Sequence, residues 1–217
     1  MTKLFTVFLS FVLMLPAAFV QADDPDTFQV ETISMKFKPG KNLEDVLSLR
    51  EKFADFANAG DIQFGSRILV PWAVSKAALP DDQDWDALWI GFSPNTGEYS
   101  KALGYYLDNG DSFNADFDAV RTNVATTLMG GHVVFRSEAG APEGVGATLF
   151  RTCQLKSKQT LNDAKTAMVS MSEKLKAGGS KGSTYFWVPG PGSPPSMEDS
   201  FLITRWFPSI EAWGESA

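Results

Sequence analysis

A pattern of helix-start residues occurs twice in the chain, first in KNLEDVLSLR and again, in the second half, in QTLNDAKTAM. In each copy a good N-cap residue, Asn42 or Thr160, is followed three positions later by an aspartate, Asp45 or Asp163. This is the spacing of a capping box, in which the two side chains bind each other's backbone N–H groups in the first helical turn. The repeat therefore predicts that one structural unit is present twice.

The order of the remaining elements agrees with a duplication. Apolar runs, breakers and caps give the order strand, helix, strand, strand, helix in both halves. In the first half, apolar residues at helical spacing over 112–128 predict a further helix, and HVVFR predicts a fourth strand. The predicted strands are 28–37, 64–72, 85–92 and 132–136 in the first half, and 147–155, 184–190 and 200–207 in the second.

The order β-α-β-β-α-β is that of a ferredoxin-like unit. Strands such as WDALWIGF have large apolar side chains on both faces, so each face of the sheet needs a cover. We therefore predict an α+β protein of two tandem ferredoxin-like units whose antiparallel sheets pack face to face as an α/β barrel. The predicted parts are a signal peptide at 1–22, unit 1 at 23–137, a linker at 138–146, and unit 2 at 147–217, which lacks a clear last strand.

Two segments, IGFSPNTGEYSKA and RWFPSIEAWGES, each show a strand followed by a short capped helix that carries an aromatic residue. In these segments and in its architecture, the chain resembles the dimeric α/β-barrel superfamily, which includes antibiotic-biosynthesis-monooxygenase-type (ABM) and NIPSNAP-type domains. The resemblance covers nearly all of the chain after the signal and includes no member-specific catalytic motif, so it assigns no catalytic residues. It leaves two assemblies open, a monomer with an internal pseudo-dimer and a homodimer.

The first residues, MTKLFTVFLSFVLMLPAAFVQADD, have the parts of a secretory signal. Lys3 gives a positive start, an apolar run follows, and Pro16 with the acidic residues after Ala22 favours cleavage over a membrane anchor. We expect an exported protein, periplasmic or extracellular, with no membrane contact after cleavage. The formal net charge of −7 argues against a nucleic-acid partner, and the single cysteine excludes an intramolecular disulfide.

Few residues are candidates for chemistry. His132 is the only histidine and Cys153 the only cysteine, whereas transition-metal sites usually assemble several such ligands, so no metal is predicted. His132 is either a turn or edge residue, or a general base or axial haem ligand of the kind found in some related barrels. Arg151 and Arg205 interrupt apolar strands, and they either snorkel to the sheet edge or bind the carboxylate of an apolar ligand inside the barrel. Three tryptophans, Trp89, Trp187 and Trp206, are expected to line or fill the space between the sheets, and they are the other candidates for ligand binding.

These observations favour an exported small-molecule-binding or interaction protein of the dimeric α/β-barrel type without a catalytic motif. Its expected partner is an apolar or carboxylate-bearing small molecule, and no cofactor is evident, with haem left open. The alternative is an ABM-type oxygenase, cofactor-independent or haem-assisted, that acts on an apolar substrate in the barrel. The enzyme interpretation is the weaker one, because such an enzyme needs more acid–base groups on its strands than the sequence offers.

Overall fold

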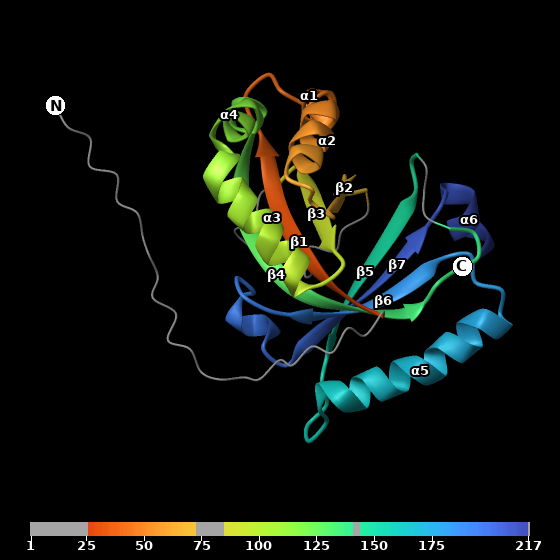
Figure 1. The fold of residues 1–217 in the computed structure, drawn as a ribbon. Helices are drawn as coiled ribbons and strands as arrows, with labels where there is room; N and C mark the ends of the chain where they lie inside the picture. The colour runs from red at the N-terminus through yellow and green to blue at the C-terminus, as the bar shows by residue number, and fades with distance from the viewer. Residues whose placement is uncertain (1–25, 73–84, 141–143, 217) are drawn as a thin grey trace.

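The computed structural model describes residues 26–72, 85–140 and 144–216, and it is an α+β fold with one curled antiparallel sheet of seven strands (Figure 1). The predicted signal peptide lies outside the described residues. Among the residues that are described, no helix is long and apolar enough to cross a membrane. The strands are β1 (Thr27–Phe37), β2 (Gly65–Leu69), β3 (Ala87–Ser93), β4 (Arg121–Phe135), β5 (Ala147–Gln154), β6 (Ser183–Pro189) and β7 (Ser200–Phe207). The helices are α1 (Leu43–Leu47), α2 (Arg50–Ala59), α3 (Thr96–Asn109), α4 (Asp111–Val120), α5 (Leu161–Ala177) and α6 (Ile210–Glu215).

The strand order is β2-β3-β1-β4-β6-β7-β5. Its first four members have the order of a β-α-β-β-α-β unit, and every pairing is antiparallel. The two halves are joined through β4 and β6, where Gly131 lies opposite Trp187. The predicted sheets are therefore joined, because the long strand β4 pairs with β1 on one edge and with β6 on the other and makes one continuous sheet.

The curled sheet packs on itself along its inner face. One buried cluster there combines Val30, Ile90 and Met129 of the N-terminal half with Trp187 and Trp206 of the C-terminal half. Aromatic rings also meet across the halves, as between Phe92 and Trp206, whose centroids lie 5.6 Å apart. The two apolar inner faces thus cover each other, which is the reason the sequence needed large side chains on both sides of its strands.

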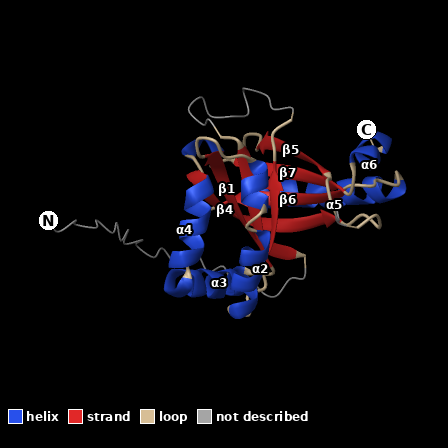
Figure 2. Ribbon diagram, turned by 90° about the horizontal axis from the view of Figure 1, so that it is seen from above, coloured by secondary structure: helices blue, strands red, loops and turns tan. Residues whose placement is uncertain are grey.

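The outer face of the sheet carries the helices. Helices α1 to α4 cover the N-terminal half, and α5 packs against β4 and β6 (Figures 1 and 2). A second buried cluster, made of Met35, Val46, Ala87, Phe117 and Val120, joins this helical layer to the sheet. Apolar side chains therefore alternate between two separate cores along the same strands.

The repeated helix starts have the predicted geometry. The Asn42 side chain accepts from the backbone N–H of Glu44 at 2.8 Å, and Asp45 accepts from the Asn42 N–H at 2.9 Å. The Thr160 hydroxyl accepts from the Asp163 N–H at 3.2 Å, and Asp163 accepts from the Thr160 N–H at 2.7 Å. Both capping boxes are confirmed.

Two predicted helices differ from the structure. The helix expected at 112–128 ends at Val120, and β4 begins at the next residue. Residues 121–128, RTNVATTL, are rich in β-branched side chains and pair with β1, and these pairings outweigh the helical spacing of the apolar residues. The first helix is also divided, with a turn at Ser48 and Leu49 between α1 and α2.

Candidate functional site

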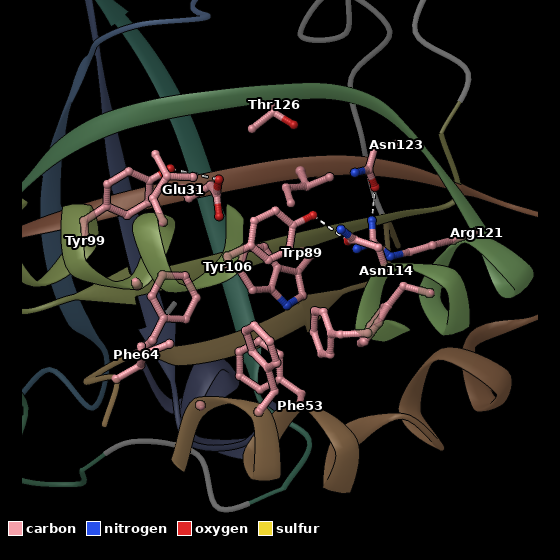
Figure 3. A pocket seen from close by; sticks show the side chains of 18 residues that line it. Glu31, Phe53, Phe64, Trp89, Tyr99, Tyr106, Asn114, Arg121, Asn123 and Thr126 are labelled. Atoms are coloured by element: carbon pink, nitrogen blue, oxygen red, sulfur yellow. Dashed lines mark hydrogen bonds between the residues drawn. The ribbon is translucent and has the colours of Figure 1, made fainter. Parts of the chain in front are cut away.

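A cavity of about 280 Å³ lies between helices α2, α3 and α4 and the outer face of strands β1, β3 and β4 (Figure 3). Eight of the 18 residues that line it are aromatic. The ring centroids of Phe56 and Phe113 lie 4.6 Å apart, those of Phe53 and Phe113 lie 6.1 Å apart, and Phe64 stacks on Trp89 at 5.5 Å. Such a wall favours a flat apolar molecule.

Gly91 leaves room for the stacked rings of Phe64 and Trp89 in the cavity wall. A Cβ at this position would lie 2.5 Å from Cε1 of Phe64 and 2.6 Å from Cη2 of Trp89, far inside van der Waals contact. The Phe64 ring can therefore lie against residue 91 of β3 only because this residue has no side chain.

Glu31 brings a carboxylate into this apolar cavity. It points outward from β1, and the Tyr99 hydroxyl of α3 donates a hydrogen bond of 3.1 Å to its Oε1 atom. Burial raises the pKa of Glu31 above its ordinary range, and this effect outweighs the Tyr99 hydrogen bond and the charge of Arg121, which both lower it. Burial and the neighbouring charge of Glu31 also raise the pKa of Tyr99, so its hydroxyl remains a donor.

Arg121 supplies a positive charge at another part of the wall. Its guanidinium lies 5.0 Å from the centroid of the Phe117 ring, and its Nη1 atom donates to Oδ1 of Asn123. Burial lowers the pKa of Arg121, against the opposing effect of nearby acidic groups, and the guanidinium remains charged at neutral pH. Figure 3 shows Glu31 and Tyr99 toward one side of the cavity and Arg121 with Asn123 toward the other.

The Tyr106 hydroxyl adds a further polar contact, since it donates to Oδ1 of Asn114. The cavity therefore combines an apolar body with polar groups placed at its margin, which is the usual composition of a small-molecule site. An acceptor at Glu31 and a donor at Arg121 can orient a ligand that enters between the rings.

Sequence reasoning did not single out Glu31, Tyr99 or Arg121. A signal for Glu31 was present, because it shares the strand parity of Ile33 and Met35, the apolar residues that follow it on the same face. No comparable signal marks Tyr99, whose position depends on how α3 packs over β1.

The three predicted tryptophans lie on different faces. Trp187 and Trp206 belong to the inner cluster, as expected, and are exposed by 0% and 8%. Trp89 lies on the outer face and lines the cavity, so its predicted place between the sheets is wrong. Adjacent side chains of a strand point to opposite faces, and in β3 Ile90 points to the inner face, so Trp89 points to the outer one.

His132, Arg151 and Arg205 also lie on the outer face. His132 is paired with Phe186, which has the opposite parity to the inward-pointing Trp187, and their ring centroids are 6.1 Å apart. None of the three is among the residues that line the described cavity.

Arg205 donates to the Ser180 hydroxyl at 3.1 Å, and its guanidinium lies 4.9 Å from the Phe207 ring centroid. It is opposite Leu149 on β5, while the exposed Arg151 is opposite Ile203. The two arginines therefore share the outer face, because Trp206 takes the inward parity next to Arg205, and of the two alternatives for them the position inside the barrel does not hold. Their role in binding a ligand stays a prediction.

In the described part of the chain, no group of histidine, cysteine and acidic side chains could hold a metal ion. Haem does not fit the cavity either. Its lining has no histidine, cysteine or methionine to serve as an axial ligand, and the hydroxyls of Tyr99 and Tyr106 are engaged with Glu31 and Asn114.

No protein-family model matches the sequence, and no curated protein matches it. Among solved structures, chlorite dismutase from Candidatus Nitrospira defluvii in complex with imidazole is 8% identical, with a TM-score of 0.47, over 88% of this chain and 81% of that chain. An anthrone oxidase-like protein is 9% identical, with a TM-score of 0.47, over 88% of this chain and 77% of that one. A candidate monooxygenase from Lactobacillus acidophilus is 10% identical, with a TM-score of 0.47, over 87% and 79%. Because each TM-score is below 0.5, the function proposed below rests on the cavity and not on these likenesses.

Proposed function

We propose that this protein is an exported small-molecule-binding protein, and that its ligand enters the cavity between α2–α4 and the sheet. The observation that carries the proposal is the aromatic cavity itself, into which Glu31 and Arg121 bring one charge of each sign. Because the two charges balance, the cavity suits a largely apolar molecule with modest polar groups better than a strongly charged one.

We also propose that the second half is a shortened copy of the first unit. The order β6-β7-β5 matches three of the four strands of the N-terminal unit, and α5 starts with the same capping box as α1. Under this proposal the chain forms the pseudo-dimer internally.

A cofactor-independent oxygenase is a second candidate, favoured by one observation. Glu31 is a desolvated carboxylate in an apolar cavity, which is the environment of many catalytic bases. The scarcity of acid–base groups had weakened this interpretation at the level of the sequence, and Glu31 supplies one.

The binding proposal is tested with N-phenyl-1-naphthylamine, a neutral probe whose fluorescence rises in apolar surroundings. We expect saturable binding to the purified protein and loss of that binding in Ala57→Phe, because Ala57 lines the cavity and the new ring fills it. Ala54→Phe is the matched control, since Ala54 is exposed on the same helix and does not line the cavity. Equal binding by both variants would place the probe elsewhere and overturn the proposal.

A second assay separates binding from oxygenation. Oxygen consumption is measured with the protein and an aromatic ketone that has an acidic α-C–H bond, and then with Glu31→Gln. Consumption that depends on Glu31 would support the oxygenase candidate, and its absence alongside saturable probe binding would leave the binding function alone.

A further inference from the structure

The Glu31 carboxylate is placed so that a ligand in the cavity must change its solvation. It lines the cavity, and the phenylalanine rings of the same wall offer no hydrogen bonds to an ionised carboxylate. Its direct cross-strand neighbours, Gly91 on β3 and Leu128 on β4, are uncharged. Solvent in the cavity is therefore a main source of solvation for its charge, besides the hydrogen bond from Tyr99.

Two groups from neighbouring elements act on the Glu31 carboxylate. The Tyr99 hydroxyl of α3 donates to one of its oxygens, and Arg121 of β4 attracts it electrostatically. Arg121 is restrained by its contacts with Phe117 and Asn123, and it is also attracted by Asp118 of α4. The other groups that line the cavity from α2 and β3 carry no charge.

A neutral apolar ligand that fills the cavity replaces the water near Glu31 with carbon atoms. The ionised carboxylate then loses solvation, whereas the protonated carboxyl loses much less and becomes a hydrogen-bond donor. The direction of this effect is already visible without a ligand, since burial raises the pKa of Glu31 against both favourable neighbours.

Resting on the proposed binding function, we propose that Glu31 takes up a proton when a neutral apolar ligand binds, so that the cavity binds such ligands more tightly in acidic solution. The protonation of Glu31 also determines the class of ligand. It is a neutral molecule, and one with a carbonyl or ether oxygen near Glu31 gains a hydrogen bond from the protonated carboxyl. A carboxylate ligand meets Glu31 as a like charge and gains no such bond.

The test measures the dissociation constant of N-phenyl-1-naphthylamine from pH 8 to pH 5 by fluorescence. For the wild-type protein we expect the dissociation constant to decrease as the pH is lowered, with a limiting slope of about tenfold per pH unit for one coupled proton. For Glu31→Gln we expect a constant that hardly changes with pH and resembles the acidic value of the wild type. Glu51→Gln, an exposed substitution on α2, is the matched control and should retain the wild-type slope.

Tyr99→Phe gives an independent check. It removes a hydrogen bond that favours the ionised carboxylate, so the rise in affinity should begin at a higher pH than in the wild type. The same series with 2-naphthoate tests the ligand class, and tighter binding of this anion than of the neutral probe at pH 7 would overturn it.

The two proposals fail in different ways. If the probe binds to neither the wild type nor Glu31→Gln at any pH, the proposed binding function is wrong. In a second case the probe binds the wild type but not Ala57→Phe, and its dissociation constant depends on pH in the same way in the wild type and in Glu31→Gln. The binding function then stands and the proton coupling is refuted.

Discussion

Replacement of Gly91 by alanine tests whether the cavity wall is built as described. The added methyl would lie 2.5 Å from Cε1 of Phe64 and 2.6 Å from Cη2 of Trp89, whereas carbon atoms in contact are separated by about 3.5–4.0 Å. The Phe64 ring must therefore move by about 1 Å or more, and the free direction is into the cavity.

The expected cost combines two opposing effects. Overpacking of a well-packed site costs about 1–3 kcal/mol. Loss of backbone freedom in the unfolded chain returns about 0.4–1 kcal/mol for a glycine-to-alanine change. We therefore expect Gly91→Ala to lower the free energy of unfolding by about 0–2.6 kcal/mol, and to weaken binding of N-phenyl-1-naphthylamine because the displaced ring occupies the cavity.

Urea denaturation and probe titration measure both effects. Gly104→Ala is the control, because a Cβ at this exposed position of α3 meets nothing within 4 Å and should be neutral or stabilising. Phe64→Leu in the Gly91→Ala background should recover part of the loss, with a coupling free energy of about 0.5 kcal/mol or more. If Gly91→Ala is as stable as the wild type and binds the probe equally well, the Phe64 ring does not lie on Gly91 and the described wall is wrong.

Three further substitutions probe other parts of the structure. Trp187→Ala should lower the free energy of unfolding by about 3–5 kcal/mol, measured by urea denaturation, because the side chain is fully buried in the inner cluster. Thr160→Ala should cost about 0.5–2 kcal/mol in the same assay through loss of the α5 capping box. The raised pKa of Glu31 gives a stabilising contribution that is present below the ordinary glutamate pKa and lost as pH rises through the raised one. The free energy of unfolding of Glu31→Gln minus that of the wild type, measured by urea denaturation, should therefore be larger at pH 7 than at pH 4.

The arrangement of strands and helices could largely be predicted from the sequence because its signals are local. A cap such as Asn42 with Asp45, or a breaker such as Pro39 with Gly40, acts within a few residues. The stretch 112–128 was mistaken because its apolar spacing fits a helix, while the choice of strand depends on pairing with β1, far away in the sequence.

The cavity could not be predicted in the same way. Its wall combines rings from α2, α3, α4 and β3, and their meeting depends on how the helices pack on the sheet. The sequence shows that Trp89 is a large residue in a strand, but only the register of β3 decides that it points toward the helices. Glu31 is the one cavity residue that the sequence could have indicated. It shares the strand parity of Ile33 and Met35, and burying an acidic side chain beside apolar ones costs free energy unless it has a partner or a function.

The described cavity lies wholly within the N-terminal half, yet its shape depends on the C-terminal half. Val30 and Ile90 point into the inner cluster with Trp187 and Trp206, and their chain neighbours Glu31 and Trp89 point into the cavity. The inner cluster therefore holds the backbone positions from which the cavity residues project, because successive side chains of a strand leave from opposite faces. A substitution in β6 or β7 that loosens this cluster should alter ligand binding without touching the ligand, whereas one on the outer surface of α5 should not.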